Sequence, residues 1–295
     1  MSIRKKTDKL LRCLMTIISP KLNTRVLYYS KKRKRFNMSN PQTFEEKLLT
    51  LKLNNYNHNP LVKQCADKYA VRGFIKEKGL EELLNELYGV YESPEDIPWD
   101  ELPNQFALKL NVGCGCNYIC KDKSSADKTK VYERAKKWLK NNYWLGYAEI
   151  QYKNVPKKLL VEKYLSSADG TVPADYKIYC FNGNPTAILF MDGRFTGEMN
   201  VGFFDVDWNY LGIEHNKKKK FRDFAAENMP SAPCALKKMI NASRVLSKDF
   251  PFVRVDFFEI DGKAVFSELT FTPAGGFEPS QVNVNGKTMA ELLQL

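Results

Sequence analysis

The chain contains, at residues 252–271, the stretch FVRVDFFEIDGKAVFSELTF, which predicts two β-strands joined in a hairpin at Asp261-Gly262. Side chains alternate between the two faces of a strand, so one face of this hairpin is apolar and packs on the core. That face holds Val253, Val255, Phe257, Val265, Leu269 and Phe271. The opposite face then gathers Arg254, Asp256, Glu268 and Thr270.

This placement requires an odd-length turn, such as a three-residue loop with Gly262 in the left-handed conformation. A two-residue turn would put Asp256 and Glu268 on opposite faces. Two carboxylates on adjacent strands repel each other unless a cation lies between them. Their oxygens, beside the Thr270 hydroxyl, suit Mg²⁺, and Arg254 can hold phosphate oxygens through two parallel hydrogen bonds. The alternative is a solvated sheet face with cross-strand ion pairs.

Two motifs nearer the start of the chain add to this phosphate chemistry. Lys109 lies in a predicted strand, 106–111, and the turn Gly113-Cys114-Gly115 that follows offers backbone N–H groups to a phosphate. It is not a Walker motif, because no Gly-Lys-Ser/Thr follows. Residues 160–165, Leu-Val-Glu-Lys-Tyr-Leu, form a strand in which Glu162 and Lys163 interrupt the apolar residues. Taken singly, the two motifs are equally compatible with a tight turn and an ordinary amphipathic strand.

The rest of the pattern mixes helices and strands without regular alternation. Helices are expected over 44–53, from about Cys65 to Gly79, over 127–141 and over 234–248. Further strands are expected over 158–165, 176–182 and 186–192. The predicted fold class is therefore α+β rather than a doubly wound α/β sheet. No apolar run approaches the roughly 20 residues that cross a bilayer, and we expect a cytosolic protein.

The positive charge is concentrated at one end of the chain. The net charge is +12, from 46 Lys+Arg against 34 Asp+Glu, but residues 1–35 hold twelve of the basic residues and a single acid, Asp8. The remaining residues are nearly neutral, which argues against a nucleic-acid binder that contacts its ligand with the whole folded body. The basic segment also carries Leu10, Leu14 and Ile17 and suits an anionic membrane surface or an acidic polymer. A solvated basic segment without a partner is the third possibility.

Seven cysteines, an odd number without regular spacing, indicate reduced thiols. Cys114, Cys116 and Cys120 are close together, but their C-x-C-x3-C spacing lacks a second pair, and both histidines are remote in sequence. Small residues in a glycine turn explain them better than zinc does.

The order of these motifs resembles that of ATP-grasp enzymes, and most of all that of the TupA-like (teichuronopeptide-biosynthesis) ATP-grasp family. The family's pattern matches five stretches: Phe-Glu-Glu-Lys-Leu at 44–48, Asp-Lys-Tyr-x-Val-Arg at 67–72, Leu-Pro-x-x-Phe-x-Leu-Lys-x-Asn at 102–111, Asp-Tyr-Lys-x-Tyr-x-Phe-Asn-Gly at 175–183 and Glu-Leu-Thr-Phe-x-Pro at 268–273. The resemblance covers about residues 40–285. It implies an ATP-grasp fold with a helical, basic N-terminal region, 1–66, and an ATP-grasp domain, 67–290. Within that domain it implies a glycine-loop part, about 106–165, and a metal-binding part, about 166–290.

The resemblance also implies roles for individual residues. Lys68 and Lys109 would contact the phosphates of ATP, and the loop Gly113-Cys114-Gly115 would close over them. Backbone atoms in the segment Glu162-Lys163-Tyr164-Leu165 would contact adenine, and a carboxylate, Asp175 or Glu162, the ribose. Lys177 would face the triphosphate, Arg254 would stabilise the transition state, and Asp256 and Glu268, with Thr270, would bind Mg²⁺. Two positions depart from the family: Val112 and Cys114 stand where His and Ser are usual, and the wider superfamily commonly has Asn at the position of Thr270.

The function implied by this resemblance is a ligase. Such an enzyme activates a carboxylate as an acyl phosphate, and an amine then attacks it to form an amide. The expected substrates are an amino acid or other amine and a uronic acid of a capsular or cell-wall polysaccharide precursor, an acidic glycan or lipid-linked intermediate. One rival is a glycosyltransferase, for which Asp205-Val-Asp207 offers a metal motif, although a turn at a strand end explains that motif better. The other rival is a non-catalytic polyanion-binding protein.

Overall fold

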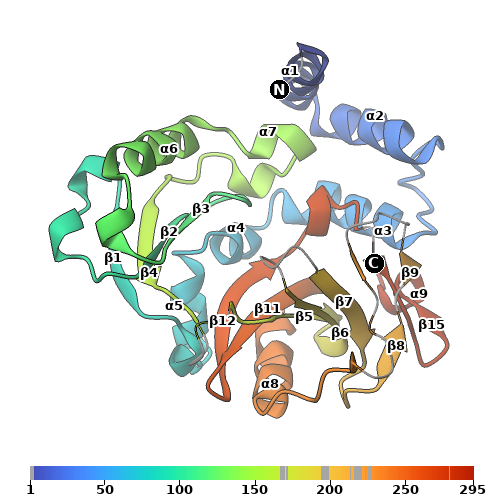
Figure 1. Cartoon of the computed structure of the whole chain (residues 1–295). Helices are drawn as coiled ribbons and strands as arrows, with labels where there is room; N and C mark the ends of the chain where they lie inside the picture. The colour runs from blue at the N-terminus through green and yellow to red at the C-terminus, as the bar shows by residue number, and fades with distance from the viewer. Residues whose placement is uncertain are drawn as a thin grey trace. The chain divides into compact units, whose positions relative to one another are not determined.

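The computed structural model describes residues 3–166, 170, 172–193, 199–212, 214–215, 221–222, 224, 228–278 and 280–295 (Figure 1). The chain divides into two compact units. Residues 1–35, 53–74 and 85–164 form the first unit, and residues 36–52, 75–84 and 165–295 form the second. Each unit combines helices with a sheet whose strands are mostly antiparallel, which confirms the predicted α+β class.

The first unit is built on a four-stranded antiparallel sheet in the order β1-β4-β2-β3. Helix α6 packs against it, and Val131, Ala135 and Trp138 of that helix join the core with Phe106 and Leu108 of β2. The elements of this unit are α1 (Ile3–Ile18), α2 (Pro20–Lys32), α4 (Pro60–Ala66), β1 (Leu87–Tyr91), β2 (Phe106–Leu110), β3 (Asn117–Cys120), α6 (Lys128–Lys140), α7 (Trp144–Tyr147) and β4 (Leu159–Lys163). Helix α5 (Val71–Glu77) and a π-helical turn (Lys52–Tyr56) continue from one unit into the other along the chain.

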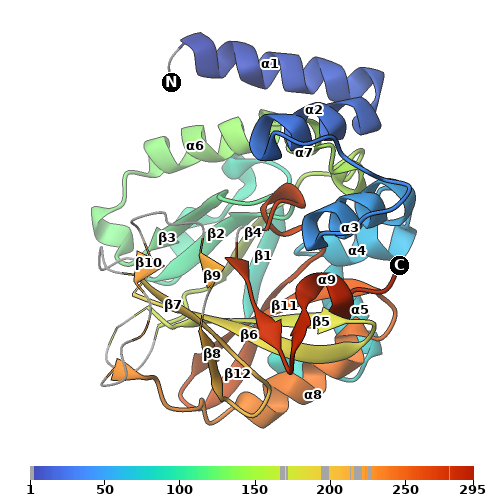
Figure 2. The same ribbon diagram turned by 90° about the vertical axis from the view of Figure 1, so that its right-hand side faces the viewer.

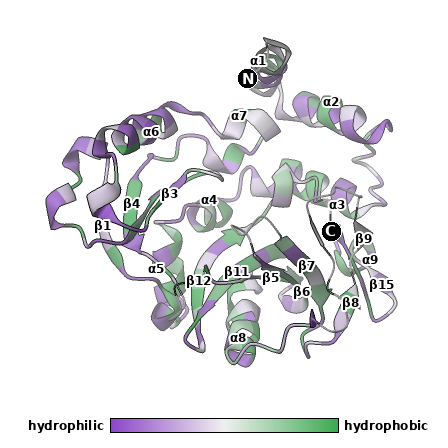
Figure 3. Ribbon diagram, in the orientation of Figure 1, coloured by the Kyte–Doolittle hydropathy of each residue, from purple (hydrophilic) through white to green (hydrophobic). Residues whose placement is uncertain are grey.

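The second unit is built on a seven-stranded sheet in the order β10-β7-β6-β5-β11-β12, with β8 paired to β7. Helix α8 packs against β5, β6 and β11 of this sheet. Figure 3 colours parts of α8, β11 and β12 green, as hydrophobic. The helices of this unit are α3 (Phe44–Leu51), α8 (Leu236–Ser247) and α9 (Met289–Leu292). Its strands are β5 (Asp175–Phe181), β6 (Asn184–Asp192), β7 (Met199–Phe204), β8 (Tyr210–Gly212), β9 (Glu214–His215), β10 (Phe221–Arg222), β11 (Phe252–Ile260), β12 (Lys263–Thr270), β13 (Ser280–Gln281), β14 (Asn283–Val284) and β15 (Lys287–Thr288).

The last hairpin keeps Asp256 opposite Glu268, as expected, but by a different route from the odd-length turn. Ile260 pairs with Lys263, so the turn has two residues, Asp261 and Gly262, both with positive φ. The register then shifts by one residue between Asp256 and Phe257, because Ser267 is an extra residue on β12. This β-bulge restores the pairing that a two-residue turn would have lost.

The bulge also corrects the predicted core. Beyond it, Phe266 and Ala264 are buried, whereas Val265, which the alternation placed in the core, is only partly buried. The ring of Phe266 meets that of Phe257 edge to face, 6.2 Å between centroids, and so joins the same apolar face.

The expected helix from Cys65 to Gly79 is interrupted. Helix α4 ends at Ala66, and Asp67 adopts an extended conformation. Its carboxylate accepts hydrogen bonds from the backbone N–H groups of Tyr69 and Ala70, at 2.7 and 3.2 Å, before α5 begins. An aspartate that bonds nearby backbone donors competes with helix continuation, which explains the break.

The helical character expected for the first residues is confirmed by α1 and α2, which lie side by side in Figure 2. None of the helices formed by the described residues is both long enough and apolar enough to cross a bilayer.

Candidate functional site

Three neighbouring strands of the second unit carry the predicted metal and phosphate residues. In the register of β5, β11 and β12, Asp256 lies between Lys177 on one side and Glu268 on the other. One step along, Arg254 lies between Tyr179 and Thr270. Since cross-strand partners share a face, these six side chains form two adjacent polar rows on one face of the sheet, opposite the face covered by α8.

Asp256 is the central residue of the first row, between Lys177 and Glu268. It is 1% exposed, and both of its oxygens accept from the fork of Arg254, Nε to Oδ1 and Nη2 to Oδ2, at 2.7 Å each. Lys177 Nζ donates to Oδ2 at 2.9 Å and also lies 3.3 Å from Asp175 Oδ1. Burial alone would raise the pKa of Asp256, but the charges of Arg254 and Lys177 outweigh it and hold that pKa below its usual range. The carboxylate is therefore ionised.

Glu278 is a member of this cluster that the sequence analysis missed. It is buried, accepts a 2.9 Å hydrogen bond from Tyr179 Oη, and lies 3.8 Å from Arg254 Nη1. Burial first, and the neighbouring Glu278 charge second, raise the pKa of Tyr179 well above its ordinary value, so the phenol stays protonated as a donor. Arg254 is thus held from two sides. Glu278 follows two glycines in a loop, and no strand periodicity marks it.

The composition of this cluster suits a divalent cation. It holds the carboxylates of Asp175, Asp256, Glu268 and Glu278 against the cations of Lys177 and Arg254, so its formal charge is −2. Thr270 Oγ1 lies 3.5 Å from Glu268 Oε1 and 3.3 Å from Arg254 Nη2. Among the described residues, no three His, Cys, Asp or Glu side chains converge on one point. Mg²⁺ commonly binds through one or two carboxylates and takes its other ligands from water and phosphate, so the cluster fits it.

The first unit contains a second charged group, on β2 and β4. Lys109 Nζ lies 2.7 Å from Glu162 Oε2, and Arg72 Nη1 lies 3.8 Å from Glu162 Oε1. Glu162 is buried, whereas Lys109 and Arg72 are partly exposed. The ion pair places the predicted phosphate-binding lysine near the end of β2, an inner strand of the sheet, beside a buried carboxylate that fixes its position.

The glycine turn between β2 and β3 is held at its base by Asn111. This fully buried side chain donates to Asp67 Oδ2 at 2.8 Å and to the Pro156 carbonyl at 3.0 Å, and accepts from the Lys158 N–H at 2.8 Å. Lys68 Nζ donates to the Gly113 carbonyl at 2.7 Å. Two of the predicted phosphate-binding elements, Lys68 and the Gly113–Gly115 turn, are therefore in contact within this unit.

Gly113 needs to be glycine for two reasons. Its φ is +77°, and a Cβ at this position would lie 2.6 Å from the Tyr143 ring. The Tyr143 hydroxyl contacts the Cys116 thiol. Burial, together with this hydrogen bond, raises the pKa of Tyr143 to about 12. Cys114 is exposed at the tip. The turn is thus tight and supported from below by an aromatic ring.

The predicted adenine segment begins at the end of β4. The Lys163 N–H donates to the Glu86 carbonyl at 3.0 Å, and its own carbonyl accepts from Asn85 Nδ2 at 2.9 Å. The carbonyl retains a second lone pair for a ligand, whereas the N–H is used. Tyr164 and Leu165 end the first unit and begin the second.

Replacing Asn111 with alanine is expected to destabilise the first unit by about 3 kcal/mol, since three buried hydrogen bonds are lost at about 1 kcal/mol each. Urea unfolding measures the change. Asn117→Ala is the matched control, because Asn117 is an exposed asparagine on the same hairpin and its loss is expected to cost at most about 0.5 kcal/mol. Equal effects of the two substitutions would contradict the anchoring role of Asn111.

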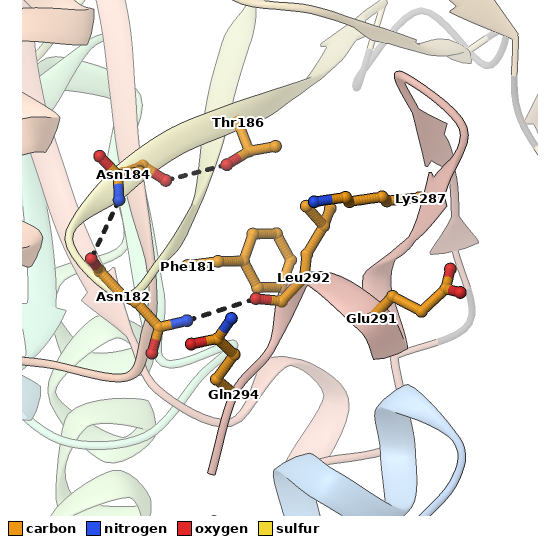
Figure 4. A pocket seen from close by; sticks show the side chains of 8 residues that line it. All are labelled: Phe181, Asn182, Asn184, Thr186, Lys287, Glu291, Leu292 and Gln294. Atoms are coloured by element: carbon orange, nitrogen blue, oxygen red, sulfur yellow. Dashed lines mark hydrogen bonds between the residues drawn. The ribbon is translucent and has the colours of Figure 1, made fainter.

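Two other features of the second unit lie outside the charged cluster. The Asp205 carboxylate accepts from the backbone N–H groups of Asp207 and Asn209, which confirms that this motif forms a turn after β7. A cavity of about 240 Å³ opens between helix α9 and the turn that joins β5 to β6 (Figure 4). Asn182, which lines it and donates to the Leu292 carbonyl, is five residues from Lys177, roughly 15 Å along a strand.

Comparisons with known proteins identify a family and several similar solved structures. The model of the family described as TupA-like ATPgrasp matches residues 46–290. Similar solved structures include D-alanine–D-alanine ligase from Bacillus anthracis, 18% identical, with 70% of this chain covering 57% of that one at a TM-score of 0.40. The same ligase from Helicobacter pylori is 14% identical, with 73% covering 56% and a TM-score of 0.41. The ATP-grasp ligase PsnB, solved with a phosphomimetic precursor variant, Mg and ADP, is 11% identical, with 77% covering 58% and a TM-score of 0.42.

The chain therefore spans little more than half the length of these solved structures. A search of curated proteins found no match. The family match extends over most of the chain and includes both charged groups, the glycine turn and the last hairpin. The chain belongs to the TupA-like ATP-grasp family.

Proposed function

We propose that this protein is an ATP-dependent carboxylate–amine ligase. The observation that carries the proposal is the row Lys177, Asp256 and Glu268 with Arg254 one step along, because it combines two fixed cations with carboxylates of the kind that bind Mg²⁺. Phosphoryl transfer needs mainly positioning and charge neutralisation, and it requires no nucleophile from the protein.

In the proposed reaction, a substrate carboxylate oxygen attacks the γ-phosphorus of ATP, and the bond from that phosphorus to the β–γ bridging oxygen breaks to release ADP. The amine nitrogen then attacks the acyl phosphate carbon, phosphate leaves, and a proton from nitrogen passes to solvent. Arg254 and Lys177, which hold Asp256 without nucleotide, have donors that phosphate oxygens can take over. Mg²⁺, held by Asp256 and Glu268 beside Thr270, would neutralise phosphate charge.

The remaining nucleotide contacts in this proposal come from the other residues that the family resemblance implies. Lys68, Lys109 and the backbone N–H groups of the Gly113-Cys114-Gly115 turn bind phosphates, and the segment from Lys163 to Leu165 contacts adenine. Asp175 or Glu162 contacts the ribose. Residues 67–290 make up the ATP-grasp domain, with a glycine-loop part at about 106–165 and a metal-binding part at about 166–290, and residues 1–66 form the basic helical region.

For the substrates, we favour a uronic acid of a capsular or cell-wall polysaccharide precursor as the carboxylate and an amino acid or other amine as its partner. The support is the family together with the basic segment 1–35, which matches an acidic or lipid-linked glycan in charge. We propose that the enzyme is cytoplasmic and that residues 1–35 hold it at the inner face of a membrane.

Calorimetric titration of the protein with ATP tests the proposal. We expect binding that requires Mg²⁺ and that weakens at least about tenfold in Glu268→Gln, which removes a metal-binding charge without changing shape. Asp249→Asn is the control, since this carboxylate of the same unit is exposed and pairs with Lys78 at the surface. Binding of a nucleotide sugar in place of ATP would favour the glycosyltransferase. Binding of neither nucleotide would refute the ligase. If ATP binds, assays of phosphate release with uronic acids and amino acids would identify the substrates.

A further inference from the structure

Helices α1 and α2 direct polar side chains toward α7, another helix of the first unit. Thr16 Oγ1 donates to the Leu145 carbonyl of α7 at 2.7 Å, and Asn23 Nδ2 donates to Thr16 Oγ1 at 2.6 Å. Asn23 also lies 3.4 Å from the carbonyls of Leu145 and Gly146. Thr16, Asn23 and Thr24 are buried, and so are Leu27 and Tyr28 of α2. The contact made by α1 is therefore polar, whereas α2 buries both polar and apolar side chains.

The outward side of α1 is apolar. Leu10, Leu14 and Ile17 follow the four- and three-residue spacing of one helix face, and Leu11 and Ile18 widen that face. At 100° per residue, Thr16 lies on the opposite side of the helix. The five apolar side chains are 49 to 76% exposed. The amphipathic pattern is thus reversed relative to a helix that buries its apolar face in its own protein, and Figure 2 shows α1 with α2 and α7 along one side.

Helix α2 also exposes apolar side chains, although it buries Leu27 and Tyr28 on its other side. Leu22, Val26 and Tyr29 are exposed and share one face by the same spacing. Arg25 and Lys32 lie on the helix surface beside this face, and both are exposed. An apolar stripe bordered by basic residues is the pattern of helices that lie in the interface of an anionic bilayer. We name the eight apolar residues of the two helices the outer stripe: Leu10, Leu11, Leu14, Ile17, Ile18, Leu22, Val26 and Tyr29.

Charge decides between the possible occupants of the outer stripe. The segment 1–35 has a net charge of +11, from twelve basic residues and Asp8. A second copy of the chain would bring the same charge against it, and like charges at an interface disfavour association. An acidic glycan would match the charge but offers little apolar surface to cover leucine and isoleucine. An anionic phospholipid bilayer satisfies both requirements, because it supplies negative headgroups and acyl chains.

We propose that α1 and α2 bind the surface of an anionic phospholipid bilayer, with the outer stripe inserted among the lipids and the first unit held beside the membrane. The helices lie in the plane of the interface and do not cross it. The surface is separate from the charged clusters that carry the proposed ligase chemistry, and its test requires no nucleotide.

The experiment is cosedimentation of the full chain with vesicles of equal parts phosphatidylglycerol and phosphatidylcholine. We expect binding that weakens with added salt and is much weaker on vesicles of phosphatidylcholine alone. Leu14→Glu combined with Ile17→Glu should reduce binding on the order of 100-fold, about tenfold for each apolar side chain withdrawn from lipid. The matched control is Met229→Glu with Val245→Glu, which adds the same charges at two apolar residues of the second unit that are 38 and 40% exposed.

Thermal unfolding of both double variants checks that they fold. Four results would overturn the proposal. The first three are equal binding to neutral and anionic vesicles, equal effects of the two double variants, and self-association that the Leu14 and Ile17 substitutions abolish, which would assign the outer stripe to a second copy. Retention by an acidic polysaccharide such as polygalacturonate that depends on Leu14 and Ile17, with no vesicle binding, would assign it to glycan instead.

Discussion

Asp256→Asn should unfold at markedly lower urea concentration than the unmodified protein. The change keeps the shape of the side chain but removes the charge that faces Arg254 and Lys177, so two cations remain in a buried site without their common partner. Breaking a buried ion pair in this way typically costs about 3–5 kcal/mol. Asp249→Asn, at an exposed pair with Lys78, should cost less than about 1 kcal/mol. A loss as small for Asp256 would mean that the cluster does not stabilise the sheet.

The same carboxylate predicts how stability depends on pH. The pKa of Asp256 is lowered on folding, so the unfolded state binds its proton more readily. The stabilisation is therefore present above the unfolded value of about 4 and is lost as the pH falls through the lower folded value. Urea unfolding between neutral pH and pH 3 should show a smaller decline in Asp256→Asn than in the unmodified chain. Parallel declines would contradict this assignment.

If the proposed ligase reaction is correct, Arg254→Lys should lower its turnover number about 100- to 1000-fold, the usual effect of removing one donor that stabilises transition-state charge. Lysine keeps the positive charge but lacks the planar fork that spans both oxygens of Asp256. Affinity for Mg-ATP should change far less, because Lys177 and the carboxylates remain. Steady-state kinetics beside calorimetry separates the two quantities. Arg244→Lys on α8 is the control, and equal losses in both variants would rule out a specific role for Arg254.

Much of the candidate site could be predicted from the sequence because it lies on strands. The alternation in 252–271 placed Arg254, Asp256, Glu268 and Thr270 on one face, and the register of β11 and β12 confirms it. Lys177 joins them because β5 pairs with β11 over the same stretch. Strand periodicity is a local property of the sequence, so it can be recognised without knowledge of the fold. The roles assigned to these residues in binding and catalysis stay predictions.

What could not be predicted depends on contacts between distant segments. Ser267 resembles any other strand residue, so its bulge, and with it the burial of Phe266 in place of Val265, has no local mark. Glu278 lies in a loop and becomes part of the cluster only through Tyr179 and Arg254. The helix break at Asp67 could have been predicted, because aspartate side chains often accept hydrogen bonds from nearby backbone N–H groups. The hydrogen bond that its carboxylate accepts from Asn111 could not, because Asn111 is more than forty residues away in the sequence.

The bulge at Ser267 is a surplus residue: removing it would leave every pair of the hairpin intact, from Arg254 with Thr270 to Ile260 with Lys263. What the extra residue adds is curvature, because a bulge bends its strand and increases the local twist. The curvature of β12 beside Glu268 and Thr270 thus depends on a residue that has no role in the proposed chemistry. Anyone who wishes to retune the spacing of these oxygens without changing a single ligand should begin by deleting residue 267.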